Sequence, residues 1–270
     1  MAKTPPIVLT IAGFDPSSGA GVTADLKTIA AHGCYGVACI TTLTVQSSKG
    51  VRRVVPVAEE VVWETLEELQ SDFKIAGIHI GMLGKQEIVQ VVSEFLDKHE
   101  KTWVVLDPVL RSSSGAELLD SAGAKLLVEK LLPLVTVITP NVDEASALTG
   151  LPVTNAEQMR AAAAKLHGMG AKTVVITGGH LDTATDLLSY PAPGGIRQQE
   201  FSSPQLASPS THGTGCAFAT ALACHLALGK GLSEAVPLAK AYVEAAIANA
   251  YPLGEGIGPV NHLYRLGNIR

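Results

Sequence analysis

The segment from Thr211 to Cys216 contains the residue types of an anion-binding loop. It reads Thr-His-Gly-Thr-Gly-Cys and leads directly into residues 217–228, which are mostly small and apolar and predict a helix. The first N–H groups of a helix have no partner within the helix, and together with the helix dipole they attract an anion. Gly213 and Gly215 carry no Cβ, so their backbone can approach a phosphate closely. The same glycines are also typical of a plain turn, and the loop alone leaves both interpretations open.

Cys216 ends this loop and would lie beside a bound anion. A free thiol has a pKa of about 8.5, and a helix N-terminus lowers it, so a thiolate that takes a proton from a substrate hydroxyl is one interpretation. Bound phosphate opposes this shift because it adds negative charge. The alternative interpretation is that Cys216 packs as a small residue.

Carboxylate and amide oxygens follow two predicted strands at the points where those strands end. Asn141 and Glu144 come just after a strand that ends near residue 138, and Asp107 ends another strand before a proline. Oxygen ligands at such positions suit magnesium, which proteins usually hold partly through water. A structural role fits equally well, because Pro-Asn is a typical start of a capped helix and Asp107 could end its strand in a turn.

Short apolar runs alternate with helix-like segments along the chain. Strands are predicted at residues 7–12, 36–43, 75–80, 103–106, 135–138 and 173–176, and helices at 22–31, 58–72, 85–98, 115–131, 155–168, 215–228 and 233–250. Residues 186–190 and 195–201 predict an antiparallel pair. This alternation predicts a mostly parallel sheet with helices on both faces, and such sheets bind ligands beyond the carboxyl ends of their strands.

The composition narrows the class of protein. The chain has 270 residues, of which 47% are hydrophobic and 17% charged, so it can bury a substantial core, and one α/β domain over residues 1–270 is the simplest interpretation. A net charge of -5 argues against a general nucleic-acid-binding role. We see neither a signal peptide nor a run of about 18 apolar residues that would span a membrane. The four cysteines form no disulfide or zinc pattern. A soluble, cytoplasmic protein with reduced thiols is therefore expected.

A set of short motifs, in this order and at this spacing, resembles the hydroxymethylpyrimidine and phosphomethylpyrimidine kinases of thiamine biosynthesis, within the ribokinase-like superfamily. The motifs are TIAGFDPSSGAG (10–21), ADLK (24–27), TVQ (44–46), GML (81–83), DPV (107–109), NVDE (141–144), GGH (178–180), THGTGC (211–216) and GIGPV (256–260). The resemblance covers almost the whole chain. It implies a three-layer sandwich with a mostly parallel central sheet covered by helices on both faces.

The resemblance also implies an activity and the residues that carry it. Members transfer the γ-phosphoryl group of ATP, with Mg²⁺, to 4-amino-5-hydroxymethyl-2-methylpyrimidine and then to its monophosphate, and they tend to form homodimers. The family's catalytic base and anion hole fall on Cys216, Gly213, Thr214 and Gly215. Positions around the pyrimidine fall on Gly13, Asp25, Gln46, Met82 and Val109. Positions for ATP fall on Asp107, Asn141, Glu144, Thr177 and Gly179, and Asp107 and Glu144 are the implied metal ligands.

The chain departs from the family at Thr177. Many relatives carry a lysine just before the glycine pair that here follows Thr177, and in them the lysine can reach ATP phosphates. Thr177 supplies a hydroxyl but no cation. Either nucleotide affinity is weaker, or another basic residue such as Lys27 compensates.

Two of the pyrimidine positions can be interpreted from their own chemistry. The amide of Gln46 both donates and accepts, so it complements an amino group beside a ring nitrogen, although Gln46 followed by Ser-Ser-Lys-Gly is also good turn chemistry. Asp25 lies one turn into the first predicted helix, where it either bonds the pyrimidine amino group or only stabilises the helix N-terminus. The resemblance favours substrate contact for both. Met82 and Val109 read as core on pattern alone, and only the resemblance makes them pocket walls.

Other functions fit parts of the sequence. Pyridoxal or pyridoxine kinase is the closest alternative, because relatives on this scaffold accept that similar heteroaromatic alcohol. A dinucleotide-dependent oxidoreductase shares the alternating pattern, but residues 13–19 do not supply G-x-G-x-x-G. A non-catalytic pyrimidine sensor would keep Gln46 and Asp25 but could lose Cys216 or the glycine loop. Both are present, which favours an enzyme.

Overall fold

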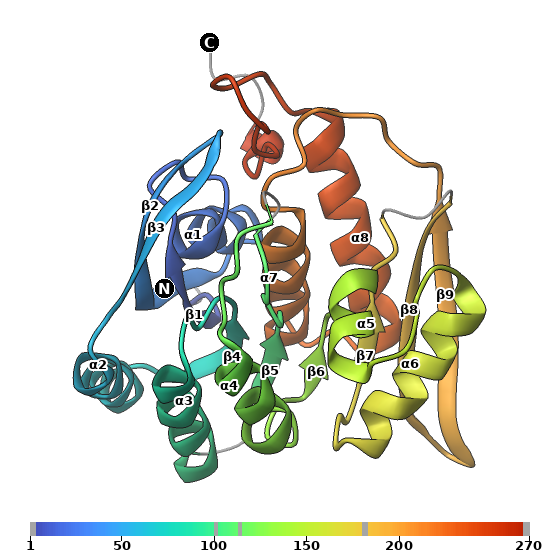
Figure 1. The fold of residues 1–270 in the computed structure, drawn as a ribbon, viewed down its shortest axis with the longest axis horizontal. Helices are drawn as coiled ribbons and strands as arrows, with labels where there is room; N and C mark the ends of the chain where they lie inside the picture. Colours follow the sequence, from blue (N-terminus) through green and yellow to red (C-terminus); the bar gives the residue numbers. More distant parts are fainter. Residues whose placement is uncertain (1–3, 100–101, 113–114, 180–182, 267–270) are drawn as a thin grey trace.

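The apolar runs of the sequence pair into one sheet at the centre of the molecule (Figure 1). The computed structural model describes residues 4–99, 102–112, 115–179 and 183–266, and within them the sheet has nine strands in the order β3-β2-β1-β4-β5-β6-β7-β8-β9. The strands are β1 (Ile7–Phe14), β2 (Tyr35–Ser47), β3 (Gly50–Pro56), β4 (Ile75–Ile80), β5 (Trp103–Leu106), β6 (Val137–Ile138), β7 (Val174–Ile176), β8 (Ala184–Ala192) and β9 (Gly195–Ser203). The helices are α1 (Gly21–Ala31), α2 (Glu59–Asp72), α3 (Gln86–Lys98), α4 (Ser121–Leu126), the π-helical turn η1 (Leu127–Leu131), α5 (Val142–Thr149), α6 (Ala156–Gly168), α7 (Thr214–Ala227), α8 (Leu232–Ala248) and the 3₁₀ turn η2 (Tyr264–Leu266).

The centre of the sheet is parallel, and both edges are antiparallel. Strands β2, β1, β4, β5, β6 and β7 pair in parallel, whereas β3 pairs antiparallel with β2, and β8 and β9 continue antiparallel from β7. The expected mostly parallel sheet and the expected antiparallel pair are therefore confirmed. Strand β3 was not predicted from the sequence. It is an edge strand with two exposed arginines at its middle and no buried residue, so its sequence lacks the apolar pattern of a buried strand.

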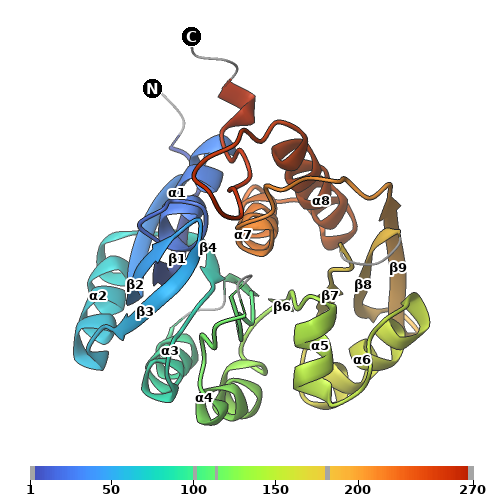
Figure 2. The same ribbon diagram turned by 45° about the horizontal axis from the view of Figure 1, so that its top comes forward.

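The helices form two layers, one on each face of the sheet (Figures 1 and 2). Helices α1, α7 and α8 cover one face, and α2 to α6 cover the other, each over its own apolar cluster. Helix α7 is buried over every residue from Ala217 to Leu226, because it packs against α1, α8 and the strands β4 and β5. Its small side chains allow this close packing, and its N-terminus is thereby held at the carboxyl edge of the sheet. The three-layer α/β sandwich is confirmed. Within the described part of the chain, no helix is long and apolar enough to cross a membrane.

One predicted helix is shorter than expected. The sequence predicted a helix over 115–131, but α4 begins at Ser121, where the Asp120 side chain caps it by accepting a hydrogen bond from the Gly123 N–H at 2.6 Å. The preceding residues are extended instead: the Leu118 N–H donates to the Leu110 carbonyl at 2.9 Å. Helix α5 is also present, although the sequence indicated it only as one of two interpretations of Asn141.

Buried histidines make the stability of this fold sensitive to acid. Burial, then the neighbouring His32 and the charge of Arg265, lower the pKa of His225 to about 4 from an ordinary 6.5. The unfolded chain therefore takes up a proton at about pH 6.5, whereas folded His225 stays neutral until about pH 4. We expect stability to fall as the pH drops through this window, with His225 contributing about 1.4 kcal/mol per pH unit.

The variant His225→Leu tests this expectation, because within the described residues neither ring nitrogen of His225 has a hydrogen-bond partner to lose. Urea unfolding at pH 8, 6.5 and 5 should show a shallower loss of stability in the variant than in the wild type. Parallel profiles for the two proteins would show that His225 contributes nothing to the acid sensitivity.

Candidate active site

The carboxyl ends of β1, β2, β4 and β5 meet the N-terminus of α7 around a cavity of about 830 Å³. Most of the residues expected from the sequence line it: Gly13, Gln46, Met82, Asp107, Val109, Asn141, Glu144, Gly213, Thr214, Gly215 and Cys216. They come from six separate segments of the chain, which the parallel sheet brings to one edge. Asp25, Thr177 and Gly179 do not belong to this lining.

The glycine loop at the start of α7 is held in one conformation. Gly213 is the N-cap of α7 with a φ of 84°, and a Cβ built on it would overlap the backbone oxygen of Gly19. The His212 N–H donates to the Gly258 carbonyl at 3.0 Å, and the Val260 N–H donates to the His212 carbonyl at 3.2 Å. The first N–H groups of α7 are thus aimed at the cavity by a loop that is fixed on both sides, which suits an anion.

Cys216 lies at the start of α7, partly exposed to the cavity although most of its surroundings are protein. Its thiol donates a hydrogen bond to the Asp107 carboxylate, and its sulfur accepts one from the backbone N–H of Gly21 at the start of α1. Burial, followed by the negative charges of Asp107 and Asp25, raises the pKa of Cys216 well above its usual value. The expectation of a lowered pKa is wrong for this arrangement, because burial and the nearby carboxylates outweigh the helix terminus.

Asp107 connects the end of β5 with the start of α7. Its carboxylate is buried, lies beside Gly215 and accepts the hydrogen bond from Cys216. Burial raises the pKa of Asp107 to about 6, although the nearby positive charge of His79 opposes the shift. This carboxylate can accept a proton or contribute to binding a cation, and its contacts support both roles.

Asn141 and Glu144 form a capping box at the start of α5, which is the structural role that the sequence allowed for the pair. The Asn141 Oδ1 accepts hydrogen bonds from the N–H groups of Asp143 and Glu144, each at 2.9 Å, and the Glu144 Oε2 accepts one from the Asn141 N–H at 2.9 Å. Glu144 also lines the cavity. Burial and the charge of Asp107 raise the pKa of Glu144 to about 8. A buried carboxylate held close to another is stabilised by a cation between them.

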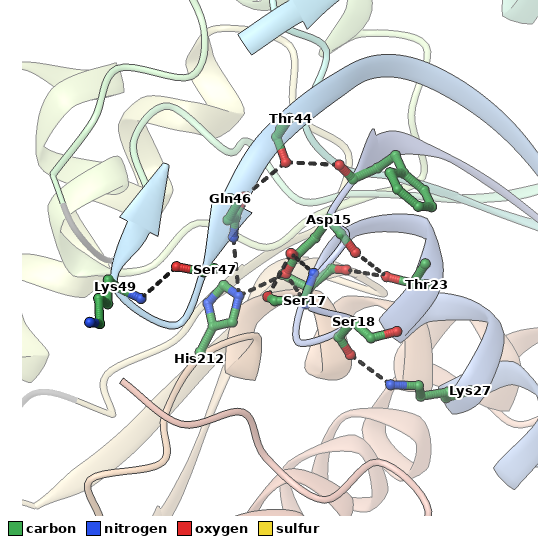
Figure 3. A network of polar contacts seen from close by, with 12 residues as sticks. Asp15, Ser17, Ser18, Thr23, Lys27, Thr44, Gln46, Ser47, Lys49 and His212 are labelled. Carbon is green, nitrogen blue, oxygen red and sulfur yellow. Dashed lines mark hydrogen bonds and ion pairs between the residues drawn. The ribbon is translucent and has the colours of Figure 1, made fainter. Parts of the chain in front are cut away.

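Two side chains, Thr44 and His212, lie against the amide of Gln46, and Asp15 holds His212 (Figure 3). The Thr44 hydroxyl donates to the Gln46 Oε1 at 3.2 Å, and the Gln46 Nε2 lies 3.3 Å from the Nε2 of His212. That ring nitrogen is also 2.9 Å from the Oδ2 of Asp15. Burial alone would raise the pKa of Asp15, but hydrogen bonds from His212 and Ser17 outweigh it and hold this pKa below its usual value. The amide is therefore positioned by a network that also joins the first glycine-rich loop to the loop before α7.

The structure differs from the sequence-based expectation at Asp25. Asp25 is fully buried in α1 and accepts hydrogen bonds from the hydroxyls of Thr10 at 2.6 Å and Thr220 at 2.9 Å. The Nδ1 of His79, also fully buried, lies 3.3 Å from its Oδ2. Asp25 is therefore occupied by protein partners, and its full burial and absence from the cavity lining argue against direct substrate contact.

Thr177 and Gly179 lie at the end of β7, beside the end of β6. The Thr177 N–H donates to the Pro140 carbonyl at 2.9 Å, and Gly179 is exposed. His180, the last residue of that motif, lies outside the described residues. Lys27, the candidate replacement cation, donates instead to the Ser18 carbonyl at 2.7 Å and does not line the cavity.

Some lining residues were not expected from the sequence. They include Phe14, Thr44, Arg111, His212 and Ile257. Arg111 follows a strand end by a few residues, and this position is the signal that could have identified it. His212 had no such signal, because its role depends on contacts with residues 166 and 197 positions away in the chain.

The chain was compared with known proteins. The family model for phosphomethylpyrimidine kinase matches residues 15–261. The chain is 42% identical to the hydroxymethylpyrimidine/phosphomethylpyrimidine kinase of Haemophilus influenzae, over 94% of this chain and 96% of that protein. It is 41% identical, over 97% of its length, to the thiamine biosynthesis bifunctional protein ThiED of Geobacter sulfurreducens, of which it spans about half, 53%. Its fold is similar to the crystal structure of an ADP complex of Bacillus subtilis pyridoxal kinase, with a TM-score of 0.88, 33% identity, and coverage of 98% of this chain and 100% of that chain.

Proposed function

The chain belongs to the phosphomethylpyrimidine kinase family, and on this premise we propose that it phosphorylates 4-amino-5-hydroxymethyl-2-methylpyrimidine with ATP, and then its monophosphate, in thiamine biosynthesis. The observation that best supports this proposal is that one cavity combines two different surfaces. Gln46, Met82 and Val109 suit a flat heteroaromatic ring with an amino group, whereas the start of α7 suits a phosphoryl group.

The pyrimidine is held by groups that do not take part in the chemistry. The amide of Gln46 complements the amino group and the adjacent ring nitrogen, and two such hydrogen bonds fix the orientation of the ring. Met82 and Val109 provide apolar walls, and the absence of a Cβ at Gly13 leaves room beside Met82. This orientation directs the hydroxymethyl group towards the start of α7.

The transferred phosphoryl group is proposed to bind at the N–H groups of Gly213, Thr214 and Gly215. Fixed dipoles at this position stabilise the charge that develops between the attacking and the leaving oxygen. Cys216 is proposed to accept the hydroxyl proton of the substrate while its own S–H proton passes to the Asp107 carboxylate, with which it is hydrogen-bonded. The nucleotide is proposed to extend from there towards the ends of β6 and β7, where Asn141, Thr177 and Gly179 lie.

Asp107 and Glu144 fit a magnesium ion that accompanies ATP. Both are buried carboxylates that line the cavity, and burial followed by the charge of Asp107 raises the pKa of Glu144. Among the described residues no group of three or more His, Cys, Asp or Glu side chains could hold a metal ion, so phosphate oxygens and water would complete the coordination. When bound, the ion neutralises phosphate charge during transfer.

We expect Gln46→Leu to impair pyrimidine capture. The substitution removes both hydrogen bonds to the ring while it keeps a side chain of similar size, and a lost bond to a polar group of the substrate costs about 1–3 kcal/mol. The kcat/KM for the hydroxymethylpyrimidine should fall about 10-fold to 100-fold, mainly through KM. Thr44→Val is the matched control: it removes the hydroxyl that contacts the amide of Gln46 and the Phe14 carbonyl but keeps the amide itself, so it should have a smaller effect. An unchanged kcat/KM in Gln46→Leu would remove Gln46 from the site.

ADP release tests the proposed activity directly. The purified protein with Mg²⁺ and ATP should release ADP with the hydroxymethylpyrimidine and with its monophosphate. Pyridoxal kinase is the second candidate, because a pyridoxal kinase is among the structures similar to this fold. The ratio of kcat/KM for the pyrimidine and for pyridoxal separates the two. Binding of the pyrimidine with no turnover of any of these substrates would instead support a sensor.

Three further expectations form part of the proposal. We propose that residues 1–270 form one domain, that the protein is a homodimer, and that it acts in the cytoplasm. Sedimentation analysis of the purified chain tests the dimer, and limited proteolysis tests the single domain.

A further inference from the structure

The charges around the cavity are unbalanced. Its lining contains five carboxylic acids: Asp15, Asp107, Glu117, Asp143 and Glu144. Among the described residues that line it, Arg111 is the one lysine or arginine. The unphosphorylated pyrimidine carries no negative charge, but its monophosphate carries close to two at neutral pH. The second substrate therefore needs a cation that the first does not.

A short hairpin fixes the position of Arg111. The Leu118 N–H donates to the Leu110 carbonyl at 2.9 Å, and the Ser112 N–H donates to the Ala116 carbonyl at 2.8 Å. This register places Arg111 directly opposite Glu117. Within the described residues Arg111 makes no ion pair, so its guanidinium is available to an anion.

Residues of this hairpin contact both ends of the cavity. Arg111 follows the pocket wall Val109 by two residues, and the Leu110 N–H donates to the carboxyl group of Glu144 at the phosphate end. The next residue, Ser112, borders a small hollow that is shared with Gln46. A phosphate on the methyl substituent of a ring bound at Gln46 would occupy the region between these two ends.

We propose that Arg111 binds the phosphate of the pyrimidine monophosphate and so favours the second phosphorylation, an inference that rests on the proposed function. In that step a non-bridging oxygen of the substrate phosphate forms a bond to the γ-phosphorus of ATP. The bond from the γ-phosphorus to the β–γ bridging oxygen breaks, and ADP leaves with that electron pair. The ionised phosphate has no proton to lose, so the step depends on holding two anions close together. Guanidinium suits this because it binds phosphate through two parallel hydrogen bonds.

The variant Arg111→Gln tests the proposal, with Arg197→Gln as the matched control. Arg197 is exposed on β9, outside the cavity lining, and its loss changes the net charge equally. In Arg111→Gln, kcat/KM for the monophosphate should fall about 10-fold to 100-fold, whereas kcat/KM for the unphosphorylated pyrimidine and KM for ATP should change less than about 3-fold. Arg111→Lys should retain part of the activity. Glu117→Gln removes a repelling carboxylate and should raise kcat/KM for the monophosphate.

Two results would overturn the proposal. One is an equal loss with both pyrimidines together with a raised KM for ATP, because Arg111 would then serve the nucleotide. The other is an unchanged kcat/KM for the monophosphate.

Titration calorimetry with the monophosphate and no ATP separates this inference from the activity: weaker binding to Arg111→Gln than to wild type would support the inference even if no turnover occurred. Equal binding to both proteins would contradict it. Thermal melts confirm that each variant is folded.

Discussion

Replacing Cys216 with alanine is expected to lower kcat for the hydroxymethylpyrimidine by about 10²-fold to 10⁴-fold, the usual contribution of a positioned base. Phosphoryl transfer depends mainly on positioning and on stabilisation of charge, and the loop of Gly213 to Gly215 provides both without the thiol. Binding of an ATP analogue should therefore change little. Steady-state ADP release and equilibrium titration measure the two effects separately.

The second reaction provides an internal contrast. An ionised phosphate oxygen needs no base, so Cys216→Ala should lower kcat for the monophosphate much less than kcat for the hydroxymethylpyrimidine. Cys224→Ala is the matched control, since Cys224 lies on the same helix but is fully buried in the core. It should cost some stability and leave kcat unchanged. Wild-type kcat in Cys216→Ala would refute the assignment of the base.

Because the pKa of Cys216 is raised, bound ligands must lower it before the side chain can act as a base. Burial and the charges of Asp107 and Asp25 keep the thiol protonated in the protein alone. A cation held by Asp107 and Glu144 would offset part of that negative charge. The base would then be strongest with the cation bound, whereas the negative charge of bound phosphate would act in the opposite direction.

Local patterns were enough to predict most of the fold. The central strands are short runs of buried apolar residues, and such runs between helix-like segments predict a parallel sheet without any knowledge of tertiary contacts. The two differences have separate causes. Strand β3 has no buried face, so its pattern is that of a surface segment. The segment from Gly115 to Leu119 has helix-compatible residues but pairs with the nearby Arg111 and with the distant Gly84, and these contacts override its propensity.

The residues at strand ends could also be predicted, whereas their electrostatics could not. Gln46, Met82 and Val109 reach the cavity because the ends of parallel strands lie at one edge of a sheet. The burial of Asp25 could not be predicted in this way. The sequence places Asp25 near a helix N-terminus but does not show which face of α1 packs against α7. Once that face packs, His79, Thr10 and Thr220 become its partners. The pKa of Cys216 depends in the same way on carboxylates from three other segments.

Gly213→Ala is expected to damage both activity and stability. Gly213 has a φ of 84°, and a Cβ there would overlap the backbone oxygen of Gly19, which no side-chain movement can relieve. The loop must shift, so the N–H groups that face the cavity lose their alignment. We expect kcat to fall by about 10²-fold or more, by analogy with the loss of one oxyanion donor. Unfolding in urea should show a loss of about 1–3 kcal/mol.

The opposite end of the same helix provides the matched control. Gly229 has nearly the same conformation, with a φ of 87°, but among the described residues no heavy atom lies within 4 Å of a Cβ built there. Gly229→Ala therefore carries the backbone strain of a left-handed alanine without the overlap, and should lose stability while it keeps kcat. If Gly213→Ala also kept kcat, the alignment of the loop before α7 would not matter for transfer. The charge on the moving phosphoryl group would then have to be stabilised by other groups of the cavity.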